Sequence, residues 1–176
     1  MNNEQIIYTT AVQEGVPSEV AVLMVQQAKV ESANFKSNLF NESFNAYGMK
    51  IPSKRKSPYI RGVSPVNPPA IEGVGGYAAY RNLADSIKDL IHYFKFRDVD
   101  WNKIKTAQTY AGYLKSRGYY GPDQEVYTNM MLRYYNDAKT GIGKAINANQ
   151  GITIATGLMV VTMFTFFILK TFRSKK

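Results

Sequence analysis

The chain has 176 residues, of which 45% are hydrophobic and 20% charged, a balance typical of a folded protein. It has no cysteine and one histidine, His92, which excludes disulfides, zinc–thiolate sites, cysteine nucleophiles and multi-histidine metal sites. Lys and Arg number 22 against 13 Asp and Glu. Because four of the basic residues follow residue 150, the region before it carries a net charge of +5, which suits an anionic polymer or surface.

Two helices are predicted at the start of the chain. The first covers residues 3–14 and ends at Gly15. The second begins at Ser18, a good N-cap, runs to about Asn34, and is apolar on every face over residues 20–25. A helix that is apolar all round is buried, so we expect the other helices to pack around this one.

Residues 51–76 predict a long loop or a short hairpin between helical segments. They contain five of the seven prolines and four glycines. The basic run at residues 54–56 lies in this segment. We interpret that run as a solvated face, with contact to anionic wall polymer or phospholipid as the alternative.

Three later segments have apolar residues at positions i, i+3, i+4 and i+7, which predicts amphipathic helices. Gly118 is expected to end the second of these helices, and Pro122-Asp123 to open the third. His92 follows Ile91 in the first of these segments and is interpreted as a structural residue. The stripes consist of Ile87, Leu90, Ile91 and Phe94; of Ala107, Tyr110, Ala111 and Leu114; and of Tyr127, Met130, Met131 and Tyr134.

The end of the chain predicts a membrane anchor. Residues 151–169 carry no charge, and as a helix they would span roughly 28 Å, close to the thickness of the hydrocarbon core of a bilayer. We expect a domain over 1–136, a Gly-containing linker over 137–150, a transmembrane helix over 151–170 and a basic tail over 171–176. The alternative for the apolar run is a buried core helix.

The positive-inside rule places the basic tail in the cytoplasm and the domain outside it. The first ten residues show no secretory-signal pattern. Insertion into the internal membrane of a virus particle would account for this topology, and a bacterial cell envelope is the alternative location.

Glu31 is the carboxylate with the most suggestive position, near the end of the buried helix. The C-terminal end of a helix carries about half a negative charge, which disfavours a carboxylate, and partial burial disfavours it too. Both effects raise a pKa, as a general acid requires. On the bare sequence, a Glu at a helix end is far more often a solvated surface residue.

Four segments, in this order, resemble the lysozyme-like superfamily, in particular the endo-β-N-acetylglucosaminidases of the autolysin and flagellar-hydrolase type. They are EGVPSEVAVLMVQQAKVESANF with its Glu31-Ser32 pair, the segment 45–50 (NAYGMK), Tyr80 with the helix after it, and the segment 118–127 (GYYGPDQEVY). Where the family has a glycine soon after Glu-Ser, this chain has Ala33-Asn34-Phe35. Lytic transglycosylases share the Glu-Ser helix and its Val-Pro approach, and are the near rival.

The resemblance implies a mainly α fold, α+β and lysozyme-like, with helices around a buried central helix and a small Pro/Gly-rich lobe. It implies that Glu31 protonates the leaving glycosidic oxygen. Glu72 is the candidate for a second carboxylate and Glu42 a weaker one; a route through the substrate's own acetamido or 6-hydroxyl group needs neither. Tyr119 would position the substrate or stabilise positive charge. The residues expected to bind substrate are Ser32, Asn45, Tyr47, Tyr80 and Tyr120.

The function expected on this resemblance is a membrane-anchored glycosidase that cleaves the β-1,4 aminosugar backbone of peptidoglycan, as a phage virion-associated lytic enzyme for wall penetration. Its partners would be glycan strands, a lipid membrane through residues 151–170, and virion proteins; no metal or other cofactor is expected. Nucleic acid is not an expected partner, because no zinc, recognition-helix or aromatic-sheet signature is present. The alternatives are a lytic transglycosylase, and a structural virion or envelope membrane protein that keeps the fold with weak or no activity.

Overall fold

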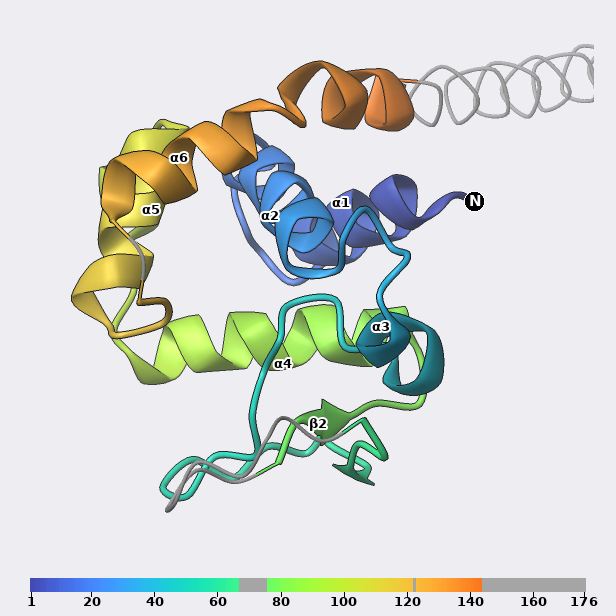
Figure 1. Cartoon of the computed structure of the whole chain (residues 1–176). Helices are drawn as coiled ribbons and strands as arrows, with labels where there is room; N and C mark the ends of the chain where they lie inside the picture. The colour runs from blue at the N-terminus through green and yellow to red at the C-terminus, as the bar shows by residue number, and fades with distance from the viewer. Residues whose placement is uncertain (67–75, 122, 144–176) are drawn as a thin grey trace, which may run out of the picture. The chain divides into compact units, whose positions relative to one another are not determined.

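One central helix organises the fold. The computed structural model of the protein describes residues 1–66, 76–121 and 123–143 (Figure 1). In it, helix α2 (Ser18–Glu31) packs against α1 (Asn3–Gln13), α5 (Ala107–Ser116) and α6 (Gln124–Leu132). Nine of its fourteen residues are buried, which confirms the prediction of a buried helix in this segment.

The two longer amphipathic helices follow their predicted stripes. All four stripe residues of α4 (Leu83–Phe96) and all four of α5 are buried. The ring of Phe94 on α4 makes edge-on contacts with Tyr110 and Tyr113 on α5, and with Trp101 in the short 3-10 helix η1 (Trp101–Lys103). Edge-to-face ring pairs add to the free energy of simple apolar burial, so this group joins α4 to α5.

The prediction for the third stripe, over residues 127–134, is only half correct. Tyr127 and Met131 are buried, but Met130 is 37% exposed. Helix α6 ends at Leu132, so Tyr134 lies beyond the last helical turn. As predicted, Gly118 follows the end of α5 with a left-handed φ of +67°, and Asp123 caps α6 by accepting a hydrogen bond from the Glu125 amide.

Ser18 is not the N-cap of α2. Pro17 occupies the cap position with an extended backbone, and Ser18 is the first helical residue, with its hydroxyl directed to the Glu19 carboxylate at 3.3 Å. The helix also ends at Glu31 rather than near Asn34, because Ala33, Asn34 and Phe35 all have positive φ.

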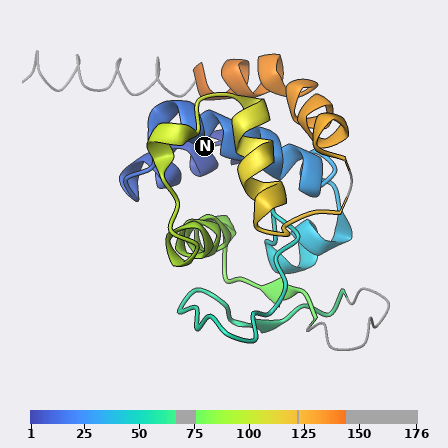
Figure 2. The same cartoon turned by 90° about the vertical axis from the view of Figure 1, so that its left-hand side faces the viewer.

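A small lobe follows the central helix. It begins with α3 (Asn38–Ser43) and contains an antiparallel pair of two-residue strands, β1 (Gly62–Val63) and β2 (Ala78–Ala79). An isolated bridge between Lys50 and Tyr77 extends the pairing. In both views, α4 separates the strands from α1 and α2 (Figure 2). The described part of the segment is therefore the predicted hairpin-like lobe, attached to one side of α4.

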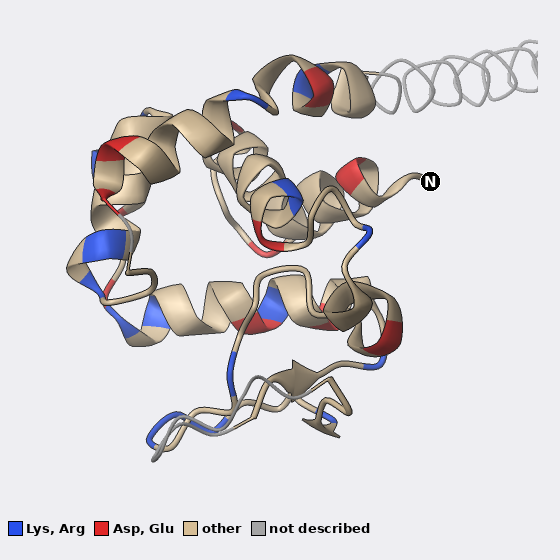
Figure 3. Cartoon of the chain, in the orientation of Figure 1, with Lys and Arg blue, Asp and Glu red and all other residues tan. Residues whose placement is uncertain are grey.

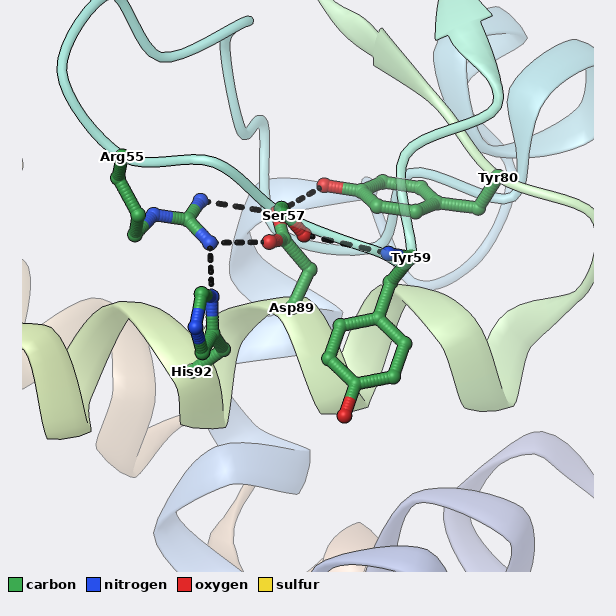
Figure 4. Close-up of polar contacts among 6 residues, drawn as sticks. All are labelled: Arg55, Ser57, Tyr59, Tyr80, Asp89 and His92. Carbon is green, nitrogen blue, oxygen red and sulfur yellow. Dashed lines mark hydrogen bonds and ion pairs between the residues drawn. The ribbon is translucent and has the colours of Figure 1, made fainter.

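A buried ion pair attaches the lobe to α4 (Figure 4). The Arg55 guanidinium donates to both carboxylate oxygens of Asp89, and the two side chains are 4% and 0% exposed. Asp89 also accepts a 2.8 Å hydrogen bond from Tyr80, and His92 Nδ1 lies 3.0 Å from the guanidinium. The basic run at 54–56 is therefore not wholly a solvated face, and His92 has the structural position expected of it.

The chain divides into two compact units, Met1–Gly141 and Ile142–Lys176. The first extends beyond residue 136 because Ala138 is buried and Gly141 packs against the Glu4 side chain. Residues 135–143 are helical, so the first half of the predicted linker 137–150 is helix. Across the described ranges, no helix is both long and apolar enough to cross a membrane; the predicted transmembrane helix 151–170 and tail 171–176 lie outside those ranges.

Asp89→Asn is expected to destabilise the protein by about 3 kcal/mol, because it leaves the buried Arg55 guanidinium without a counter-charge. The measurement is urea unfolding at neutral pH. The matched control is Asp85→Asn on the same helix, whose partner Arg81 is 65% exposed, and which should cost less than about 1 kcal/mol. Equal costs for the two variants would show that the Arg55–Asp89 pair does not hold the lobe.

Candidate functional site

Glu31 lies at the wall of an open cleft. The cleft has a volume of about 640 Å³ and is bordered by three segments: the loop 47–55, the end of α4, and residues 117–120 after α5. Glu31 is the last residue of α2, so the central helix directs it to the place where these segments meet. Among the described lining residues, it is the only carboxylate.

The chain turns sharply directly after Glu31. The Ser32 hydroxyl donates to the Ala28 carbonyl at 2.6 Å and accepts from the Phe35 amide at 2.8 Å. Ala33, Asn34 and Phe35 then take φ values of 50°, 57° and 64°, a conformation that costs a non-glycine residue about 1–2 kcal/mol. The chain therefore adopts left-handed backbone at three consecutive residues that are not glycine. Ser32, predicted to bind substrate, is buried and holds this turn instead of lining the cleft.

The surroundings of Glu31 favour its protonated form. Burial raises the pKa of Glu31 above its ordinary value, and a hydrogen bond from the Tyr127 hydroxyl to Oε1, 2.5 Å long, opposes part of that rise. In the described ranges, Glu31 forms no ion pair. Since burial is the larger effect, the carboxyl retains its proton to a higher pH than an exposed glutamate would.

Tyr127 is the site residue that sequence reasoning missed. It appears in the sequence only as a member of an apolar stripe and of a matched segment. In the structure its ring stacks on Tyr120, with ring centres 4.0 Å apart and planes 7° apart. Burial and the adjacent Glu31 carboxylate both raise the pKa of Tyr127, so its phenol stays protonated as the donor to Glu31. The signal that could have found it is its place in the 118–127 segment.

A buried asparagine shapes the loop over Glu31. The Asn45 amide nitrogen donates to the carbonyls of Met49 and Ala78, and its oxygen accepts from the Met49 amide at 3.0 Å. Gly48 in this loop has φ +60°, and a Cβ there would lie 3.5 Å from Oε2 of Glu31. Asn45 is thus fully buried and supports the loop, while Gly48 supplies the left-handed backbone conformation of its turn.

Tyr119 fastens the same loop from the other wall. Its hydroxyl donates to the carbonyl of Tyr47, and its ring lines the cleft. Tyr47 also lines the cleft; its own hydroxyl is buried and has no hydrogen-bond partner in the described part of the chain. Because its hydroxyl is already engaged, Tyr119 acts on the site by positioning the 47–48 backbone beside Glu31.

The structure brings together four of the predicted site residues, Glu31, Tyr47, Tyr119 and Tyr120, all in the cleft lining. Tyr80 is buried, with its hydroxyl on Asp89, and does not line the cleft. Glu42 is exposed on α3 and is also absent from the lining. Glu72 lies outside the described residues, so its part in the site stays a prediction.

This arrangement can perform acid catalysis. A single carboxylic acid that is partly buried yet borders an open cleft can hold its proton to a higher pH than an exposed glutamate and deliver it to a bound molecule. Aromatic side chains also line the cleft, four tyrosines among them: Tyr47, Tyr93, Tyr119 and Tyr120. Within the described ranges, no three His, Asp or Glu side chains group together as metal ligands would.

Tyr127→Phe is expected to raise the pKa of Glu31, because it removes the hydrogen bond that favours the ionised carboxylate. A group that acts in its protonated form then stays active to higher pH. The alkaline limb of the pH–rate profile should therefore move upward. Tyr120→Phe is the control, since the Tyr120 hydroxyl donates to the Ala111 carbonyl and not to Glu31. The alkaline limb of the pH–rate profile of this variant should stay where it is in the wild type. A downward move in Tyr127→Phe would contradict the assigned hydrogen bond.

Comparison of the chain with protein-family models, with curated proteins and with solved structures finds no match.

Proposed function

We propose that this protein cleaves the β-1,4-linked aminosugar backbone of peptidoglycan, with Glu31 as the general acid. The observation that carries the proposal is the position of Glu31: a partly buried carboxyl group, with a raised pKa, at the end of the central helix and open to a cleft. The order of the four sequence segments that resemble the lysozyme-like superfamily supports it. The segments that carry Glu31, the 45–50 loop and Tyr119 meet at this cleft.

The proton of Glu31 would pass to the glycosidic oxygen as the bond to the leaving sugar breaks. Tyr127 would limit the rise of the Glu31 pKa and orient its carboxyl group. Tyr119, through the Tyr47 carbonyl, would keep the Gly48 backbone beside the reacting group. The ring of Tyr120, which stacks on Tyr127 and has the Lys115 ammonium 5.4 Å from its centre, would border the bound chain.

A lytic transglycosylase is the second candidate. What favours it is that Glu31 is the only carboxylate among the described lining residues, because a transglycosylase closes an anhydro ring with the substrate's own 6-hydroxyl and needs no second carboxylate. An inverting hydrolase instead needs a second carboxylate to activate water, and Glu72 is the residue proposed for that role.

The location proposed for the enzyme is a membrane, through residues 151–170, in a phage virion or a bacterial envelope. The support is the uncharged run 151–169 and the basic residues after it. A membrane anchor would hold the cleft near its polymer and limit cleavage to a local opening in the wall.

Glu31→Gln should lower the rate of peptidoglycan cleavage by the full-length chain about 100-fold or more, because the amide cannot donate a proton to the leaving oxygen. The measurement is the release of soluble fragments from purified peptidoglycan. Glu42→Gln, on the exposed face of α3, is the control and should retain full activity. Wild-type activity in Glu31→Gln would overturn the assignment.

Loss of folding should not explain that result. A carboxyl whose folded pKa lies above its unfolded pKa contributes stability that is lost as pH rises through the two values. Glutamine does not ionise, so Glu31→Gln should lack this loss and be at least as stable as wild type at pH 7. Thermal unfolding of both proteins across pH checks this.

The chemical ends of the products separate the candidates when mass spectrometry identifies them. Reducing N-acetylglucosamine ends would establish a glucosaminidase, and reducing muramic acid ends a muramidase. Anhydro-muramyl ends would establish a transglycosylase. A folded protein that binds peptidoglycan and yields no products would favour the structural alternative.

A further inference from the structure

Besides the carboxyl group of Glu31, the cleft is lined by basic side chains. Five lysines and arginines border it, against the single carboxylate of Glu31 among the described residues. Figure 3 shows Lys and Arg positions in blue at the C-terminal end of α4 and in the lobe loop. Arg55 is neutralised by Asp89, whereas the other four form no ion pair within the described part of the chain. They are Lys50, Lys54, Arg97 and Arg117.

Two of these cations, Arg97 and Arg117, come from helix ends that are tied to one another. Arg97 is the C-cap of α4 and Arg117 the C-cap of α5. The helix ends are tied reciprocally: the Tyr93 hydroxyl donates to the Arg117 carbonyl at 3.4 Å, and the Tyr113 hydroxyl to the Arg97 carbonyl at 3.5 Å. The two guanidinium groups are therefore held on adjoining pieces of backbone.

Aromatic rings, not carboxylates, position these guanidinium groups. Arg97 lies over Tyr93 at 5.7 Å and over Phe96 at 5.9 Å, and Arg117 lies over Tyr113 at 5.4 Å. A guanidinium that stacks on a ring keeps N–H donors at its edge for a bidentate partner. Both residues are exposed and line the cleft, and Arg117 shares a hydrogen bond with the Tyr113 hydroxyl. A basic residue at a helix C-terminus also stabilises the helix, but that role does not require two arginines at one opening.

Two tyrosine rings connect Arg97 to the loop beside the acid. The Tyr93 ring lies 6.1 Å from that of Tyr119, whose hydroxyl holds the loop beside Glu31. A polymer bound along the cleft would therefore meet Glu31 and the two arginines at the same time. The aminosugar backbone of peptidoglycan is itself uncharged where its lactyl groups are amidated; the negative charges lie on the peptide stems.

We infer that Arg97 and Arg117 bind carboxylates of the peptide stems, so that the cleft takes stem-bearing peptidoglycan in preference to a bare aminosugar chain. The inference rests on the proposed function and adds to it the substrate class. Two exposed arginine–carboxylate contacts together should change affinity by about tenfold, and the change should shrink as salt rises.

The test measures binding separately from cleavage. Full-length Glu31→Gln is titrated with soluble peptidoglycan fragments that keep their stems, and with neutral chitin oligomers of matched length. We expect the stem-bearing fragments to bind about tenfold more tightly, and Arg97→Gln/Arg117→Gln in the same background to abolish that preference. The matched control is Arg81→Gln/Arg133→Gln, which removes the same charge from exposed positions outside the cleft and should keep the preference.

Three outcomes would overturn the inference. The first is equal binding of the two ligands by full-length Glu31→Gln. The second is an equal loss of affinity for both ligands when Arg97 and Arg117 are also replaced. The third is loss of the preference for stem-bearing fragments in the Arg81→Gln/Arg133→Gln control. Thermal unfolding of each variant shows whether the helix ends remain folded. Cleavage by the protein with Glu31 intact is scored independently, so stem preference without cleavage would reject the proposed function and keep the binding site.

Discussion

As the proposed general acid, the carboxyl group of Glu31 has to be shielded from water and still be open to a substrate, and the elements around it are arranged for both requirements. The buried helix α2 carries it to the cleft wall, the turn at Gly48 borders the same cleft, and Tyr127 is its hydrogen-bond partner. Burial raises the pKa, and the phenol limits that rise. The acid strength of the site is thus a balance between desolvation and one hydrogen bond.

The two cleft walls are held by different means. On one side the Arg55–Asp89 ion pair joins the lobe loop to α4, and Asn45 organises the loop beside the acid. On the other side, rings and phenolic hydroxyls join the ends of α4 and α5. Tyr119 connects the two walls through the Tyr47 carbonyl. Removing one partner of the buried ion pair should therefore disturb the lobe before it disturbs the helices.

The helices could be predicted from local pattern, because periodicity reports burial of a single helix face. Glu31 is singled out by the resemblance of its segment, because on the bare sequence a Glu at a helix end is far more often solvated. The end of α2 at Glu31 could not be predicted from local pattern, since it depends on Ala33, Asn34 and Phe35 adopting a conformation that their side chains disfavour. Local pattern also could not predict that Ser32 and Tyr80 turn inward or that Arg55 is buried. These positions depend on partners from four to thirty-four residues away in the sequence. The type of each residue indicates which chemistry it could perform. Only the packed structure shows which of these polar side chains are already engaged by hydrogen-bond or ion-pair partners.

The most direct test is a titration of Glu31 itself, followed through the ¹³C chemical shift of its side-chain carboxyl in the full-length protein and assigned with Glu31→Gln. The midpoint is predicted to lie above the ordinary glutamate pKa of about 4.3, because burial outweighs the Tyr127 hydrogen bond. It should also coincide with the alkaline limb of the cleavage rate. A midpoint at or below the ordinary value would show a solvated, ionised carboxylate and contradict its role as general acid.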